Sequence, residues 1–148
     1  MRAVIQRVKR AEVEVEGRVT GSICRGLLVF VGVEERDSTQ DGIWLTGKIA
    51  HLRIFNDDDG VMNLSVVETG GDILVVSQFT LHANVRKGNR PSYNRAAKPE
   101  KAIPLYREFL RNLESKIGRP VQTGEFGKVM SVSLLNDGPV TILIDSRE

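Results

Sequence analysis

The sequence has little cysteine and no long apolar run. Cys24 is the only cysteine among the 148 residues, so no disulfide can form within the chain. No apolar stretch approaches the ~20 residues of a membrane-spanning helix, and residues 1–7 carry two arginines where a secretory signal would be apolar. We therefore expect a cytoplasmic protein in a reducing compartment, with no membrane partner.

Common cofactor motifs are missing as well. There is no glycine-rich phosphate loop of either common type, and the two histidines and one cysteine lie far apart in the sequence. The acidic turn at Asp57–Asp59 resembles a calcium loop only loosely, because Phe55 and Val66 stand where that loop needs carboxylates. We expect a protein that uses neither a metal nor another cofactor.

The composition is that of a folded globular chain, and its charge is unevenly placed. Hydrophobic residues make up 41% and charged residues 27%, which excludes a disordered chain. The net charge is only +2, yet residues 82–98 hold five basic residues and no acid. This stretch predicts a surface loop that either binds an anionic partner or is simply solvated.

Apolar patterning predicts strands interrupted by two helices. The predicted strands cover residues 3–8, a hairpin over 13–23, and 26–33, 72–79, 129–135 and 140–145. A capping pair at Ser38 and Asp41 begins the first helix. The second runs from about Lys101 to Ile117, because Pro104 is tolerated only in a first turn. The sequence predicts one α/β domain over residues 1–148, with a mixed, barrel-like sheet and two main helices.

Isolated reactive side chains give weak functional signals. Cys24 ends an alternating strand, and burial as a small apolar residue is favoured over a role as nucleophile. His51 lies on a predicted helix, where solvation or packing is expected. His82 follows a strand end, and a phosphate contact or plain exposure is favoured over a general-base role.

Two short segments carry more information. Ser77–Leu81 crowds polar side chains at the end of an apolar strand, where free backbone N–H groups can bind a developing oxyanion. Asn136–Thr141 contains a Gly-Pro pair between two predicted strands. By themselves these segments are also explained by a strand emerging into solvent and by a tight turn.

Together, and in this order, the two segments resemble the signature of the D-aminoacyl-tRNA deacylase family, also called D-tyrosyl-tRNA deacylases. Three further segments fit the family: Ile5–Val8, Met62–Leu64 and Arg90–Ser92. The resemblance covers essentially the whole chain. It implies a deacylase-type fold and a homodimer with its active site at the subunit interface.

The resemblance also implies the activity, which is hydrolysis of the ester between a D-amino acid and tRNA, and of mischarged glycyl-tRNA. In the family the Gly-Pro bond is cis and rejects L-amino acids, so Gly138 and Pro139 are the expected chiral filter. This pair is expected to reach into the partner's pocket, with Arg7 orienting it. Asn136 and Thr141 are expected to support it.

The same resemblance assigns the chemistry and the RNA contacts. The expected catalytic residues are Ser77, Gln78, Phe79 and Thr80, with backbone N–H groups near the last two polarising the carbonyl. No obvious base accompanies Thr80 in the sequence, so we favour Thr80 as a positioning group over a nucleophile and expect water to attack, helped by the terminal ribose hydroxyl. The candidate tRNA-binding residues are Arg86, Lys87, Arg90, Tyr93, Arg95 and Lys98. We expect tRNA rather than DNA as the partner.

Two other functions fit parts of the sequence. The basic stretch and the lack of charged catalytic residues fit an RNA-binding module without catalysis, whose affinity would fall steeply with salt. A different small esterase would use Thr80 or Cys24 as nucleophile and form a covalent acyl intermediate.

Overall fold

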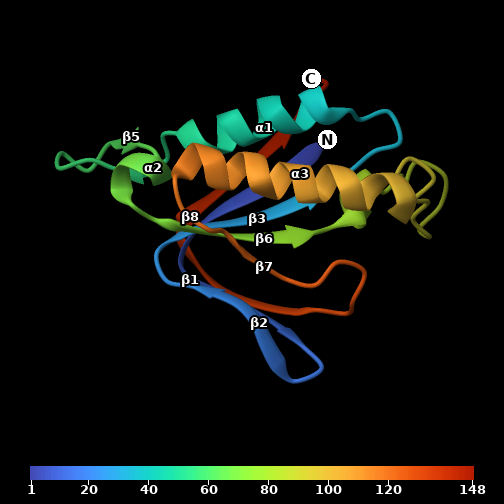
Figure 1. Cartoon of the computed structure of the whole chain (residues 1–148), viewed down its shortest axis with the longest axis horizontal. Helices are drawn as coiled ribbons and strands as arrows, with labels where there is room; N and C mark the ends of the chain where they lie inside the picture. Colours follow the sequence, from blue (N-terminus) through green and yellow to red (C-terminus); the bar gives the residue numbers. More distant parts are fainter.

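Two long antiparallel strands organise the sheet. The computed structural model describes residues 1–148 and pairs β1 (Arg2–Val15) with β8 (Ser131–Asp145) along nearly their whole length. On its other side β1 pairs first with β3 (Gly26–Gly32) and then with β2 (Arg18–Ile23). Figure 1 shows the two long strands curving together, and β1 passes from β3 to β2 along this curve.

The remaining strands make the sheet mixed and nearly closed. β6 (Asp72–Ser77) runs parallel to β3, and β7 (Gln122–Thr123) runs parallel to β6. The order is β2-β1-β3-β6-β7, with β8 also on β1. β2 curls back to β7, where a Cβ on Gly21 would lie 2.6 Å from the carbonyl oxygen of Thr123. This close approach requires glycine and gives the barrel-like shape that was predicted.

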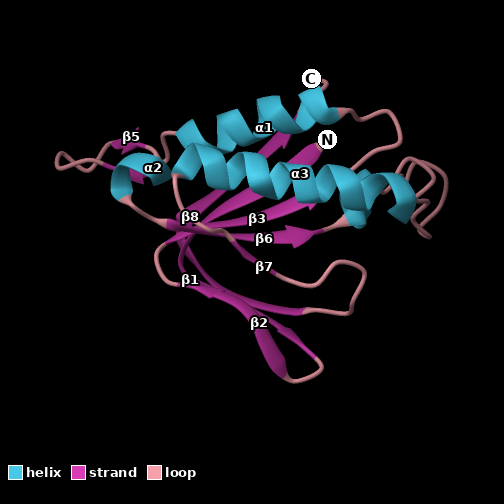
Figure 2. Ribbon diagram, viewed as in Figure 1, coloured by secondary structure: helices cyan, strands magenta, loops and turns pink.

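Helices cover one face of this sheet, as Figure 2 shows. The two long helices are α1 (Thr39–His51) and α3 (Pro99–Ile117). The short elements are α2 (Val66–Thr69), the 3-10 helix η1 (Phe79–His82), and the hairpin of β4 (Phe55–Asn56) and β5 (Met62–Leu64). No helix combines the length and the apolar composition that crossing a membrane requires.

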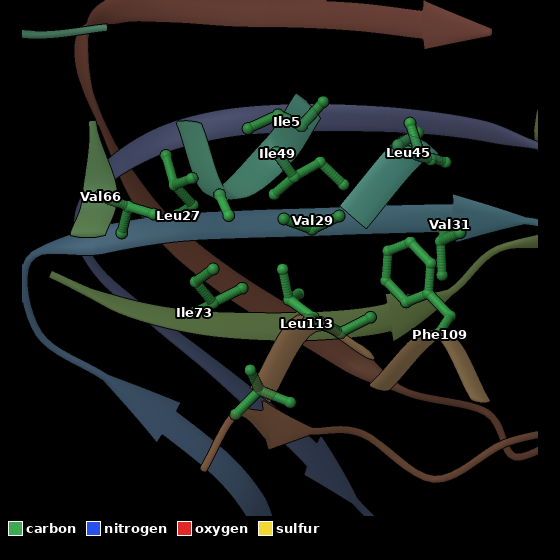
Figure 3. Packing of buried hydrophobic residues seen from close by; sticks show 14 of the residues in the cluster. Ile5, Leu27, Val29, Val31, Leu45, Ile49, Val66, Ile73, Phe109 and Leu113 are labelled. Carbon is green, nitrogen blue, oxygen red and sulfur yellow. The ribbon is translucent and has the colours of Figure 1, made fainter. Parts of the chain in front are cut away.

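The main core lies between the helices and the sheet. In Figure 3, Val29 and Val31 of β3 face Ile49 of α1 and Phe109 and Leu113 of α3. A second, smaller core fills the opposite, concave face of the sheet, and comprises Val8, Ala11, Val13, Ile23, Leu28, Leu74 and Val76. Both faces of β3 are therefore buried, as its continuous apolar run predicted.

Three predicted boundaries are wrong. α3 begins at Pro99, and Pro104 lies inside it at an exposed position, where its missing N–H removes only a bond to the carbonyl of Glu100. Ser131–Asp145 forms one continuous strand rather than two, because the turn-like segment is a bulge within β8. β6 ends at Ser77, before the chain coils into η1.

The exposure of two side chains also differs from expectation. Cys24 is exposed in the turn between β2 and β3, because it lies beyond the last residue of β2 that faces the smaller core. His82 is 1% exposed and packs against the backbone of Gly32. It is therefore neither exposed nor accessible to a phosphate group, contrary to the expectation. His51 is solvated, as expected.

A polar cluster joins the two ends of the chain to the start of α1. The carboxylate of Asp41 accepts hydrogen bonds from the Ser146 hydroxyl at 2.7 Å and from the backbone N–H of Ser38 at 2.8 Å. Burial raises the pKa of Asp41, but these hydrogen bonds outweigh burial and lower it to about 2. The ionised carboxylate therefore stabilises the fold at neutral pH.

Replacing Asp41 with asparagine should destabilise the protein by about 1 to 2 kcal/mol at pH 7, with solvent screening allowed for. The lowered pKa means that the contribution is complete above the ordinary value near 3.8 and disappears as the pH falls through about 2. Urea unfolding of both proteins at pH 7 and pH 2.5 measures this. A difference in stability that stays constant with pH would contradict it.

Candidate active site

The first motif lies where β6 ends and η1 begins. The backbone N–H of Gln78 still donates to the carbonyl of Val31, at 2.8 Å, and the chain then coils. Phe79 and Thr80 open η1, so their N–H groups have no acceptor within it, and no side chain caps the helix. Two neighbouring backbone donors at a helix start can bind an oxyanion.

The side chain of Thr80 is held in place by its neighbour. The Gln78 amide Nε2 donates to the Thr80 Oγ1 at 2.6 Å. No carboxylate or imidazole hydrogen-bonds to this hydroxyl, so it has no base to activate it as a nucleophile. The contact suits a residue that positions a ligand.

A cavity of about 580 Å³ opens beside this motif. Its walls come from β3, β6, the start of α3 and residues 126–132, and they are mainly apolar. Phe79 and Tyr93 meet edge to face at 5.1 Å between ring centroids, and both rings are partly exposed. Deeper inside, the Tyr106 hydroxyl donates to the carbonyl of Val75 at 3.3 Å. Burial raises the pKa of Tyr106, which keeps this hydroxyl protonated.

The second motif forms a projecting bulge in β8. Gln6 pairs with Thr141 and Val8 pairs with Asn136, so residues 137–140 all lie opposite a single residue of β1. The side chain of Asn136 spans the bulge, because its Oδ1 accepts from the N–H of Val140 at 3.0 Å and its Nδ2 donates to the Thr141 hydroxyl at 3.2 Å. Gly138 and Pro139, at the exposed tip, are joined by a cis peptide bond.

Arg7 is the residue of β1 that lies opposite this bulge. It is 7% exposed, and its Nε donates to the carbonyl of Asp137 at 3.1 Å. A Cβ on Gly138, whose φ is +132°, would lie 3.0 Å from the Arg7 Nη2. The guanidinium therefore packs directly on the glycine backbone and leaves no room for a side chain.

The two motifs do not meet within one chain. On β3, Leu27 pairs with Arg7, which lies next to the bulge, whereas Val31 pairs with Ser77 of the first motif. Four residues of an extended strand separate these pairings, a distance of about 13 Å along the sheet. The two motifs therefore lie at different positions along the sheet within one chain.

The basic loop of residues 83–98 extends from the end of the sheet that bears the first motif (Figure 1). Arg86, Lys87, Arg90 and Lys98 are exposed and form no ion pair. Arg95 differs, because its Nε lies 2.8 Å from the Glu34 Oε1. The hydrogen bond from Arg95 lowers the pKa of Glu34. Arg95 therefore anchors the loop to the domain and is less available to a phosphate than its neighbours.

Comparison with known proteins identifies the family. The family model described as D-Tyr-tRNA(Tyr) deacylase matches residues 4–145. The chain belongs to this family. D-aminoacyl-tRNA deacylases of Opitutus terrae and Flavobacterium johnsoniae are 61% and 58% identical to it over 147 residues, covering 99% of this chain and 98% of each relative.

Two solved structures share the fold of this chain. A protein described as c-Myc DNA Unwinding Element Binding Protein superposes with a TM-score of 0.93 at 40% identity, over 98% of both chains. A probable eukaryotic D-amino acid tRNA deacylase has a TM-score of 0.82 at 20% identity, over 97% of both chains, which shows the shared fold. The chain is an enzyme that hydrolyses an ester bond, and aminoacyl-tRNA is its substrate class.

Sequence reasoning missed part of each motif's surroundings. The cavity is lined by Tyr106 and Phe126, which are distant in sequence from the first motif. Arg7 donates from its Nη1 to the carbonyl of Ile54 at 2.5 Å and to the Asn56 Oδ1 at 3.3 Å. The apolar stripe of α3 signalled only that Tyr106 would be buried, and nothing in the sequence connects Arg7 to residues 54–56.

Gly138→Ala should destabilise the protein more than Gly60→Ala. Both glycines have positive φ, which costs an alanine about 1–2 kcal/mol at Gly60 and at least as much at Gly138, whose φ of +132° lies further from the region that L residues tolerate. Only at Gly138 does the new methyl also meet Arg7 and Val140, which adds about 1–3 kcal/mol of overpacking, whereas Gly60 faces open space. Urea unfolding compares the two. Equal losses would contradict the crowding at Gly138.

Proposed function

We propose that this enzyme hydrolyses the ester of D-aminoacyl-tRNA, releasing the free D-amino acid and reusable tRNA, and spares L-aminoacyl-tRNA. The observation that carries the proposal is the exposed Gly138–Pro139 tip, buttressed by the buried Arg7 in a chain of the deacylase family. A rigid main-chain edge of this kind suits a site that discriminates by excluding a substituent.

In the proposed chemistry, backbone groups stabilise the transition state. The N–H groups of Phe79 and Thr80 bind the oxyanion, a contribution of about 3 kcal/mol for one well-placed donor. Ser77 and Gln78 line the cavity beside them, and Gln78 orients the Thr80 hydroxyl toward a positioning role. Water attacks the ester, helped by the terminal ribose hydroxyl of the tRNA. Such a site needs neither a triad nor a metal ion.

The proposed filter works by exclusion. The carbonyls of Gly138 and Pro139 hold the amino group of the substrate and crowd the position that an L side chain would occupy. A D side chain avoids this clash, so we expect broad scope among D-amino acids. Glycine has no side chain to reject, so mischarged glycyl-tRNA is a proposed second substrate. Asn136 and Thr141 support the filter through the hydrogen bonds that span the bulge.

The proposed active unit is a homodimer in which the tip of one subunit enters the cavity of the other. The separation of the two motifs within one chain supports this arrangement. An apolar row also crosses the uncovered face of the sheet between the motifs, where Leu143, Val4 and Phe30 are register neighbours. Leu143 is 66% exposed, although it is a large apolar side chain. Burial of this row between two subunits would remove it from water.

The basic loop is the proposed contact for the acceptor end of the tRNA. Arg86, Lys87, Arg90 and Lys98 are free to pair with phosphates. Arg95 contributes mainly by anchoring the loop, and Tyr93, beside Phe79, offers a ring on which a base can stack. Because aminoacyl-tRNA is made and used in the cytoplasm, we propose that the enzyme acts there.

Binding of nucleic acid without catalysis is the alternative function, and membership of the deacylase family argues against it. The unpaired basic loop favours it, and the name of one structural relative refers to a DNA element. Such a module would bind tRNA or DNA with affinity that falls steeply with salt, and would show no turnover.

The purified protein should release D-tyrosine from D-tyrosyl-tRNA and leave L-tyrosyl-tRNA intact. Release of radiolabelled tyrosine under multiple-turnover conditions measures both rates, with glycyl-tRNA as a third substrate. Equal hydrolysis of both enantiomers would exclude the proposed filter. Binding without any turnover would favour the alternative function.

Leu143→Asp should yield monomers that are folded and inactive, because it places a charge in the apolar row. Ile43→Asp is the matched control, since Ile43 is also exposed and apolar but lies on α1, in the helical layer. Analytical ultracentrifugation, circular dichroism and the deacylation assay are compared for both variants. A fully active Leu143→Asp monomer would contradict the two-subunit site.

A further inference from the structure

The guanidinium of Arg7 is held from two sides. On one side its Nε bonds the carbonyl of Asp137, and the Asp137 carboxylate lies 3.4 Å away. On the other side its Nη1 bonds the carbonyl of Ile54 and the side-chain oxygen of Asn56. The guanidinium is planar and its N–H donors point in fixed directions, so all of these acceptors together set its orientation. The bulge that it contacts is therefore positioned partly by residues 54–56.

These residues belong to a rigid support. Phe55, which precedes Asn56, is 1% exposed in the main core, and the Arg25 guanidinium lies 5.6 Å from the centre of its ring. After Asn56, the Asp57 carboxylate accepts from the N–H groups of Asp59 and Val61, each at 3.0 Å, and closes the turn of the hairpin. Asn56 is thus held in place by the residues that precede and follow it in the sequence.

We propose that Asn56 is a positioning residue for chiral selection, acting through Arg7 on the Gly138–Pro139 tip. This inference rests on the proposed function. Asn56 itself lies in β4, and none of its contacts is with the cavity beside the first motif. Its side-chain oxygen holds the guanidinium, which packs against Gly138, so its loss lets the tip move. A tip that can move rejects an L side chain less strongly.

The experiment compares the ratio of kcat/KM for D-tyrosyl-tRNA to that for L-tyrosyl-tRNA. Asn56→Leu removes the acceptor at similar size, and Asn56→Asp restores an acceptor for the guanidinium. Asn63→Leu is the matched control, because Asn63 lies in the same hairpin and its side-chain oxygen accepts from Arg53 rather than from Arg7. Its side chain also bonds Asp57, so this variant tests loosening of the hairpin while the bond from Arg7 to Asn56 stays intact. Thermal unfolding of each variant reports separately on the fold.

Asn56→Leu should lower the ratio by about tenfold, the effect of losing one hydrogen bond to a charged group. Asn56→Asp should return it to the wild-type range, and Asn63→Leu should leave it unchanged. An unchanged ratio in Asn56→Leu, a failure of Asn56→Asp to restore it, or an equal loss in Asn63→Leu would each overturn the inference. If Asn56→Leu does not fold, Asn56→Ser replaces it under the same criteria.

The wild-type enzyme separates this inference from the proposed function. A wild-type ratio near one overturns the filter itself and the role of Asn56 with it. A high wild-type ratio that Asn56→Leu leaves intact overturns only the role of Asn56. A high ratio lost in Asn56→Leu, with a melting temperature matching that of Asn63→Leu, supports both.

Discussion

One buried cation connects the second motif to the rest of the domain. Arg7 stands in the middle of β1 with its guanidinium almost out of water, and a buried charge is tolerable only when its donors are satisfied. Its acceptors come from the bulge of β8 and from residues 54–56 after α1. The long β1–β8 ladder and the hairpin of β4 and β5 must both be in place for these contacts to form, so the geometry of the exposed tip depends on the whole domain.

The first motif contains no buried charge. Its polar groups are main-chain amides and neutral side chains at the point where a parallel strand ends and a short helix begins. Backbone donors are oriented by the fold itself and need no titratable group. The proposed mechanism therefore needs no catalytic cysteine or histidine, in a chain that has one cysteine and two histidines.

Much of the fold was predictable where local physics decides it. The apolar run of β3 required a strand buried on both faces, and the pairing of Ser38 with Asp41 marked the start of α1. Predictions failed where contacts distant in sequence override local preference. Asn136–Pro139 has the composition of a turn, yet β1 holds both flanks in one strand. Pro104 was expected near the start of a helix, yet the buried stripe of α3 carries the helix past it.

By itself the sequence determined which groups are available: two short motifs and one basic segment. It also determined the secondary structure wherever hydrophobic period and capping agree. Only the tertiary structure decided that the motifs lie at different ends of the sheet, that His82 is buried, and that Asn56 reaches Arg7. The reason is physical. Periodicity records which face of an element is apolar, whereas the register between strands, which sets distances between motifs, arises from pairings that no single segment encodes.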